Sequence, residues 1–88
     1  MAWRIEIEDS ALKELNNLAP TAQRRILRYL RERIAGADNP RLLGTSLKGQ
    51  LSEYWRYRIG NYRVICSIHD SELTVLVIRV AHRSKANR

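Results

Sequence analysis

The side chains of this 88-residue chain that are best suited to chemistry are cations near the ends of predicted strands. They are Arg56, Arg58, Arg63, His82 and Arg83. The first two stand two positions apart on one predicted strand, so both project from the same face of a sheet. Arg63 begins the next strand, and the His82-Arg83 pair ends the strand expected to lie beside it. The set spans a site of nucleotide size, since a strand rises about 3.3 Å per residue.

This set of side chains suits cleavage of RNA without a metal ion. The 2′-hydroxyl of RNA can attack its own phosphate, so a protein need only orient the strand, move protons and neutralise the developing charge. Arginine offers a planar, permanently charged fork for the last task, and histidine can exchange a proton near neutral pH. Aromatic residues alternate with the arginines and could stack on bases. Strict alternation nevertheless favours the core for Trp55 and Tyr57.

The same residues also fit less specific roles. Arg56 and Arg58 fit the solvated face of an ordinary strand, and His82-Arg83 fits an ordinary strand end. Spacing alone therefore leaves a nuclease, a binding module for nucleic acid and a basic solvated surface as open interpretations.

Positive charge is concentrated in the second half of the chain. The formal net charge is +7, and residues 1–40 hold seven Lys or Arg against six Asp or Glu, whereas residues 41–88 hold nine against three. Such asymmetry predicts an anionic partner, which would be a nucleic acid, an acidic protein or a membrane surface.

Metal and cofactor sites are not indicated. Two histidines and one cysteine show no zinc-ligand spacing. The second half offers only Glu53, Asp70 and Glu72 as carboxylates, too few and too scattered for a magnesium site. The glycines lack the spacing of a phosphate-binding loop. The sequence therefore predicts neither metal nor cofactor.

Several features predict a cytoplasmic protein without a membrane partner. Cys66 is the only cysteine, so no intramolecular disulfide can form, which fits a reducing compartment. It lies in an apolar strand pattern that predicts a small buried side chain. No signal peptide and no apolar stretch long enough to span a bilayer are present in the sequence.

The first half of the chain predicts a strand and two helices. Residues 2–8 alternate between apolar and polar side chains, as in a half-buried strand. Asp9 or Ser10 is the predicted N-cap of the first helix, and Thr21, after Pro20, that of the second. The apolar stripes are Ala11, Leu15 and Leu18 on the first helix and Ala22, Ile26, Leu30 and Ile34 on the second. The hairpin is expected to end at Gly36, Asn39 and Pro40.

The second half predicts a loop and three strands. Residues 41–52 form the loop, with Gly44 and Gly49 as hinges. The strands are Tyr54–Ile59, Tyr62–His69 and 73–82, joined by turns at Gly60-Asn61 and Asp70-Ser71. A turn at Asp70-Ser71 would place Arg63 opposite Ile78. The last strand is apolar on both faces, which predicts a central position.

The order of elements is β-α-α-β-β-β, in a single domain over residues 1–88. Strands that follow one another through tight turns pair antiparallel, and amphipathic helices bury their stripes on one face of a sheet. The predicted fold is α+β: an antiparallel sheet with the N-terminal strand at its edge, covered on one face by a helical hairpin. The other face stays available for a ligand.

Three runs of sequence resemble the RelE branch of the RelE/ParE toxin superfamily. They are Leu47-Lys48-Gly49, the run Trp-Arg-Tyr-Arg-Ile-Gly-Asn-Tyr-Arg-Val at 55–64, and Val80-Ala81-His82-Arg83. The resemblance covers nearly the whole chain. It implies the toxin of a type II toxin–antitoxin pair, a ribosome-dependent, metal-independent messenger RNA endonuclease that inhibits translation and arrests growth.

The resemblance also implies roles for individual residues. Arg63 would hold the phosphate at the cleavage point, Arg83 would stabilise the transition state, and His82 would be an acid or base. The RNA-binding residues would be Lys48, Arg56, Arg58 and Lys85. The implied partners are an acidic cognate antitoxin that wraps the toxin, the ribosome with its messenger RNA, and operator DNA through the antitoxin complex only.

The sequence departs from the resembled pattern in two places. By spacing, Asn87 stands where RelE-like chains usually carry a tyrosine, and Thr45-Ser46 stands where some relatives carry a carboxylate. Arginine at positions 56 and 58 is a poor general base because it keeps its proton up to about pH 12, so the identity of the base stays open. A ParE-like inhibitor of DNA gyrase on the same fold is the alternative function. A module that only binds RNA or an acidic partner is the third.

Overall fold

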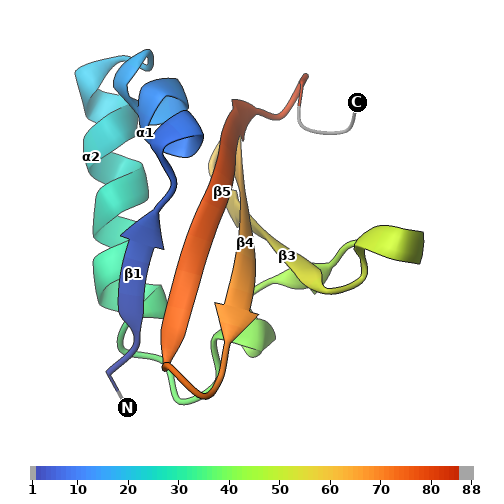
Figure 1. Cartoon of the computed structure of the whole chain (residues 1–88). Helices are drawn as coiled ribbons and strands as arrows, with labels where there is room; N and C mark the ends of the chain where they lie inside the picture. The colour runs from blue at the N-terminus through green and yellow to red at the C-terminus, as the bar shows by residue number, and fades with distance from the viewer. Residues whose placement is uncertain (1, 86–88) are drawn as a thin grey trace.

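A five-stranded sheet carries two helices on one of its faces in the computed structural model, which describes residues 2–85 (Figure 1). The strands are β1 (Arg4–Ile7), β2 (Thr45–Ser46), β3 (Tyr54–Ile59), β4 (Tyr62–His69) and β5 (Thr74–His82). The helices are α1 (Asp9–Asn16) and α2 (Pro20–Tyr29), and α2 continues into a π-helical turn, η1 (Leu30–Ile34). Two short 3-10 helices follow, η2 (Pro40–Leu43) and η3 (Gly49–Leu51).

The strands lie in the order β1-β5-β4-β3-β2, with β1 at one edge as predicted. The consecutive strands β3, β4 and β5 pair antiparallel because tight turns join them. In contrast, β1 pairs parallel with β5, since the two helices separate it from the rest of the sheet. The α+β fold is therefore confirmed, and the expected antiparallel sheet contains one parallel pair.

Local details of the first half and of the loop differ from the sequence predictions. The predicted N-caps are wrong: Glu8 and Ala19 precede the two helices, and neither makes a side-chain capping hydrogen bond. Asp9 lies instead in the first turn, where a carboxylate favours the helix dipole. Residues 41–52 are not a plain loop, because they contain most of η2, the short strand β2 and η3.

The register between β4 and β5 also differs from the prediction. The connection spans residues 70–73 rather than two residues, and Leu73 adopts a left-handed conformation with φ 48°. A bulge between Ile65 and Cys66 then shifts the pairing once more. Arg63 consequently lies opposite Ala81 rather than Ile78, and Tyr62 lies opposite His82. Both shifts bring Arg63 closer to the end of β5.

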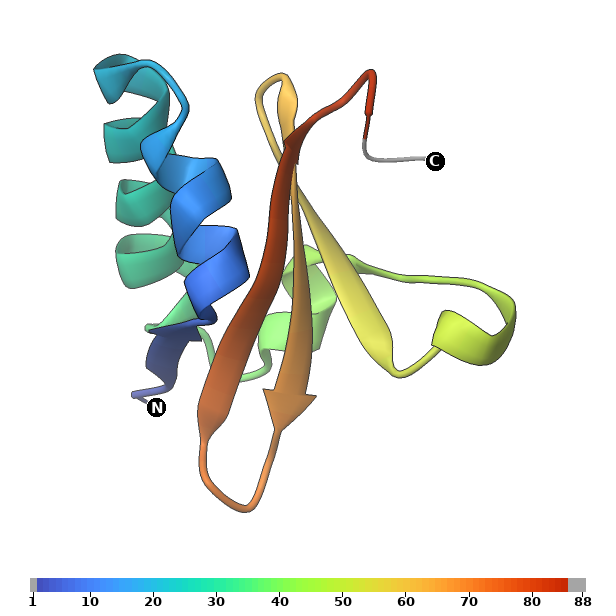
Figure 2. The ribbon, with the colours of Figure 1, turned by 45° about the horizontal axis from the view of Figure 1, so that its top comes forward.

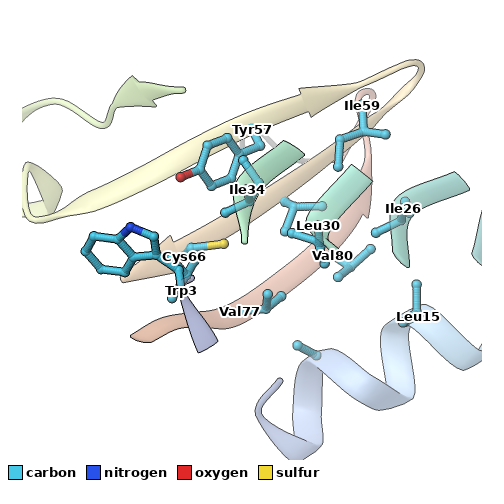
Figure 3. Packing of buried hydrophobic residues seen from close by; sticks show 13 residues of the cluster. Trp3, Leu15, Ile26, Leu30, Ile34, Tyr57, Ile59, Cys66, Val77 and Val80 are labelled. Carbon is cyan, nitrogen blue, oxygen red and sulfur yellow. The ribbon is translucent and has the colours of Figure 1, made fainter. Parts of the chain in front are cut away.

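The core lies between the helices and the sheet (Figure 3). The stripe predicted for the second helix is fully buried, and it packs against alternate side chains of the strands. Buried strand residues are Tyr57, Ile59, Val64, Cys66, Val75, Val77 and Val80. Burial raises the pKa of the Cys66 thiol to about 12, so this side chain is an inert core residue, as predicted. No described helix is long and apolar enough to cross a membrane.

Two polar contacts hold η2 against the sheet. The hydroxyl of Tyr57 donates a hydrogen bond to the carbonyl of Pro40 at 2.8 Å. The guanidinium of Arg41 donates two hydrogen bonds to the carboxylate of Asp70, at 2.9 and 2.7 Å, which joins η2 to the β4–β5 turn. Beyond β2 the chain projects away from the helices through η3 before it returns as β3 (Figure 2).

Candidate nucleic-acid interface

Three of the predicted arginines share the open face of the sheet, the face without helices. Arg58 lies directly opposite Arg63, and Arg56 lies two residues before Arg58 on β3. Residues paired across strands point to the same face, and neighbours along a strand alternate. Because Tyr57 and Val64 are fully buried beneath the helices, the arginines beside them point away from the core.

Arg83 joins this group at the end of β5. Its backbone N–H donates to the carbonyl of Asn61 at 2.7 Å, which fixes it beside the turn that precedes Arg63. The pKa of Arg63 is lowered from its ordinary value, first by partial loss of hydration and then by the charges of three neighbours. Those neighbours, in decreasing order of effect, are Arg58, Arg56 and Arg83. We call these four arginines the open-face cluster.

The guanidinium of Arg63 is held in place by the backbone. Its Nη1 donates to the carbonyls of Gly60 and Tyr62, at 3.1 and 2.9 Å. Both bonds use one nitrogen, so the N–H groups of Nε and Nη2 can address a ligand. Within residues 2–85 no carboxylate forms an ion pair with Arg58, Arg63 or Arg83. Arg63 is therefore oriented by the backbone, and within the described residues no carboxylate neutralises its charge or those of Arg58 and Arg83.

A hollow of about 330 Å³ lies beside the cluster. Its walls are Leu42, Leu43, Gly44, Thr45, Arg56, Arg58 and Arg63. Gly44 is required there, because a Cβ at this position would come within 2.9 Å of the Arg56 carbonyl oxygen and of the Tyr57 ring. The η2 segment, held by the contacts described above, thus forms one wall of a basic hollow. The volume of this hollow is in the range of sites for small ligands.

His82 points to the other face of the sheet. It lies opposite Tyr62, whose side chain packs against the core, and the two rings meet edge to face with centroids 5.6 Å apart. The N–H of Ser84 donates to Nδ1 of His82 at 3.3 Å, and the Ser84 hydroxyl lies 3.0 Å from the same nitrogen. The structure therefore brings the four arginines together and leaves the imidazole at the end of the covered face.

Neither of the two predicted lysines lines the hollow beside the cluster. Lys48 is exposed just before η3, on the projecting segment. Lys85 is exposed beyond β5, where its backbone N–H donates to the His82 carbonyl at 2.8 Å. Asn87 lies outside the described residues. No group of three or more His, Cys, Asp or Glu side chains that could hold a metal ion occurs among residues 2–85.

The sequence prediction assigned no arginine of α2 to a site. Arg25 and Arg28 line a second hollow at the end of β3, together with Arg58. The signal that could have indicated this is the Gly60-Asn61 turn, since it brings the end of β3 toward the helix.

Comparison with known proteins identifies the family. The family model described as "ParE toxin of type II toxin-antitoxin system, parDE" matches residues 5–87. The chain belongs to this toxin family. It is also 30% identical over 90 residues to Toxin RelG of Mycobacterium tuberculosis, covering 100% of this chain and 99% of that protein. It is 28% identical to the mRNA interferase toxin RelE of Escherichia coli K12, covering 98% and 88% of the two chains.

Solved structures agree with this assignment. The archaeal RelE–RelB complex from Pyrococcus horikoshii OT3 contains a chain that matches with a TM-score of 0.73 and 27% identity, over 98% of this chain and 100% of that one. The toxin–antitoxin complex RelBE2 from M. tuberculosis matches with a TM-score of 0.86 over 97% and 95%, at 24% identity, which supports the fold. This chain is thus a type II toxin–antitoxin toxin of the RelE/ParE superfamily, with a RelE-like fold.

Proposed function

We propose that this toxin is an endoribonuclease that cleaves messenger RNA on the ribosome without a metal ion. The observation that carries the proposal is the open-face cluster, in which four guanidinium groups converge on a sheet face that no helix covers. Its similarity to a relative named an mRNA interferase toxin supports the same chemistry. The consequence is inhibition of translation and growth arrest.

The cluster suits attack of the RNA 2′-hydroxyl on the adjacent phosphate. Arg63, fixed by two backbone carbonyls, would hold the phosphate in place. Arg83, at the end of β5, would neutralise the charge that develops on the phosphorane oxygens. Arg56 and Arg58 would bind the RNA backbone beside it, and Lys48 and Lys85 would contact RNA farther out.

Proton transfer is assigned to His82. Its imidazole lies next to Arg83 in sequence but on the other side of the sheet. An RNA strand that passes round the end of β5 would place a phosphate over Arg63 and Arg83 and its leaving 5′-oxygen toward the imidazole. His82 would then donate a proton to that oxygen as the bond between phosphorus and the 5′-oxygen breaks, while the proton of the attacking 2′-hydroxyl would pass to water.

The partners follow from charge and from the related complexes. A chain of net charge +7 suits an acidic antitoxin, and the similar P. horikoshii toxin is found in a complex with RelB. We propose that a cognate antitoxin wraps this toxin in the cytoplasm, and that operator DNA is contacted only through that complex. The ribosome with its messenger RNA is the proposed target.

The decisive experiment is primer-extension mapping of messenger RNA on translating ribosomes after induction of the toxin. We expect cuts within codons in the ribosomal A site, and we expect Arg83→Ala to abolish both the cuts and growth arrest. Arg31→Ala, an exposed arginine that lines neither hollow, is the matched control. Growth arrest that persists unchanged in Arg83→Ala, in a folded protein, would contradict the assignment.

Inhibition of DNA gyrase is the second candidate function, because the matching family model carries the ParE name. Induced cells would then show DNA damage and filamentation while their messenger RNA stayed intact. The same primer-extension experiment separates the two functions.

A further inference from the structure

A second basic hollow lies on the other side of the β3–β4 turn from the open-face cluster. Its volume is about 340 Å³, close to that of the first. The lining side chains are Arg25, Arg28, Tyr29, Glu32, Arg33, Arg58, Ile59 and Gly60. Three arginines come from α2 and η1 and one from β3. We call this the helix-side hollow.

The local structure explains why these arginines converge. Arg25 and Arg28 stand three positions apart, so they share one face of α2, while Ile26 and Leu30 bury the opposite face. The Arg25 guanidinium lies directly over Gly60, where a Cβ would approach its Nη1 to 2.5 Å. Gly60 therefore adopts the left-handed φ of 57° that the turn requires, and its lack of a side chain also leaves room for the Arg25 guanidinium.

The hollow also offers an aromatic surface. Tyr29 lines it, and the guanidinium carbon of Arg33 lies 5.8 Å from the centre of the Tyr29 ring. A carboxylate opposes the cations: Glu32 lies 4.0 Å from Nε of Arg28, and both side chains are about 70% exposed. Such an exposed pair is weak, so Arg28 can turn to another anion.

Arg58 connects the two hollows, since it lines both. The basic surface is therefore continuous from the open-face cluster, past the Gly60-Asn61 turn, to α2. Basic side chains that follow one path and alternate with an aromatic ring are the arrangement by which proteins hold single-stranded nucleic acid. An RNA strand fits this path better than an acidic helix, because the path turns round a sheet end.

We propose that the helix-side hollow binds phosphates of the same RNA strand that the open-face cluster holds, outside the cleavage site. This extends the proposed nuclease function, on which the identity of the strand rests. Arg25 and Arg28 would bind the phosphates, and Tyr29 would offer its ring to a base. The site would add affinity and register without taking part in the chemistry.

The test is equilibrium binding of a 2′-O-methyl RNA of about 12 nucleotides, which cannot be cleaved by 2′-hydroxyl attack. Arg25→Gln/Arg28→Gln removes two contacts. We expect its affinity to fall on the order of tenfold near 0.1 M salt, and the slope of log affinity against log salt to flatten by about 1.4. The control, Arg24→Gln/Arg31→Gln, removes the same charge from α2 and η1 outside the hollow and should change affinity far less.

Equal losses in the two double variants would overturn the inference, because bulk charge would then explain binding. Binding of an acidic peptide to the hollow, with no detectable binding of the RNA, would overturn it as well. Glu32→Gln should raise RNA affinity, since it removes the one carboxylate of the hollow. Cleavage is measured separately. A selective loss of binding in Arg25→Gln/Arg28→Gln without any cleavage by the unsubstituted protein would support RNA binding by the helix-side hollow and contradict the nuclease function. Cleavage by the unsubstituted protein with equal binding losses in the two double variants would support the nuclease function and contradict RNA binding by the hollow.

Discussion

The two faces of the sheet are built from the same strands but carry opposite kinds of side chain, apolar on the covered face and positively charged on the open face. On β4, Val64 and Cys66 are fully buried beneath the helices, whereas Arg63 points to the open face. The covered face is filled with buried apolar side chains, among them the rings of Trp3 and Tyr57 (Figure 3). The open face gathers four like charges at the end where β3, β4 and β5 meet.

That gathering is unfavourable for the fold. Like charges directly opposite one another destabilise a sheet, and Arg58 lies directly opposite Arg63. The pKa of Arg63 is lowered first by partial loss of hydration and then by these neighbouring charges, and both disfavour its charged form. We therefore expect the cluster to bind a ligand of opposite charge, which would offset this repulsion. The two faces should therefore respond to substitution in opposite ways.

Among the substitutions that compare the two faces, Arg63→Ala should show the largest effect and leave the fold intact. Removal of one preorganised charge at a developing anion typically slows a reaction about 100- to 1000-fold. We expect a loss of that size in ribosomal messenger RNA cleavage, with no fall in melting temperature, because relief of repulsion offsets lost packing. Arg79→Ala, on β5 and bonded to the Lys85 carbonyl, is the control. If Arg63→Ala lowered the melting temperature while its folded molecules cleaved at the normal rate, the contrast between the two faces would be wrong.

His82→Gln tests whether the imidazole on the covered side takes part in the chemistry. A general acid contributes about a hundredfold or more, so cleavage should fall by about that factor. If the rate is unchanged while the protein stays folded, the proton is carried by another group, and the open face alone contains the site.

Val64→Ala is the counterpart on the covered face, one residue from Arg63. The side chain is fully buried, so its truncation should lower the free energy of unfolding by about 2 kcal/mol. In a domain of this size that corresponds to roughly 10 °C in melting temperature. Urea unfolding should show a lower midpoint with the same slope. The rate of cleavage per folded molecule should be unchanged, and a selective loss of rate would contradict the separation of faces.

The sequence predicts the two faces well because alternation and helical spacing are local properties. The stripe from Ala22 to Ile34 and the burial of Tyr57 follow from spacing alone, and both are confirmed. Trp55, which the same alternation predicted for the core, is only half-buried and lies outside the core cluster. The pairing of Arg63 does not follow from spacing alone, because the length of a turn and the place of a bulge depend on how β4 and β5 pack together. The bulge also changes which residues of β5 share a face with Arg63, and it is why spacing did not show that His82 points away from the arginines.

The helix-side hollow also cannot be predicted from the spacing of residues in the sequence. Arg25 and Arg28 look like ordinary solvent-facing helix residues until the β3–β4 turn is placed against them. That placement is a tertiary contact between Arg25 and Gly60, separated by 35 positions in the chain. Charge balance predicted an anionic partner for the second half, whereas the structure adds a helix from the first half.

Tyr57→Phe probes the link between the two faces. The Tyr57 ring belongs to the core, yet its hydroxyl donates a hydrogen bond to the Pro40 carbonyl of η2. Leu42 and Leu43 of η2 line the hollow beside the open-face cluster. Loss of the donor leaves a buried carbonyl without its partner, at a cost of about 1–2 kcal/mol in unfolding free energy. We expect a smaller loss of RNA affinity as the wall loosens, measured with the same 2′-O-methyl RNA. An unchanged melting temperature would show that η2 is held by other contacts.

Asp70→Asn should have the smallest effect and a distinctive pH dependence. The two hydrogen bonds from Arg41 lower the pKa of the Asp70 carboxyl below its ordinary value of 3.8. A depressed carboxyl pKa stabilises the fold at pH values above the ordinary pKa, and this stabilisation is lost as the pH falls through the lowered value. The variant should therefore melt slightly below the unsubstituted protein near pH 7, and the difference should vanish in acid, once the pH lies below the lowered pKa. Glu72→Gln, in the same turn but not bonded to Arg41, should show no such convergence. A difference that persists in acid would mean that Asp70 acts through the turn itself and not through its tie to η2.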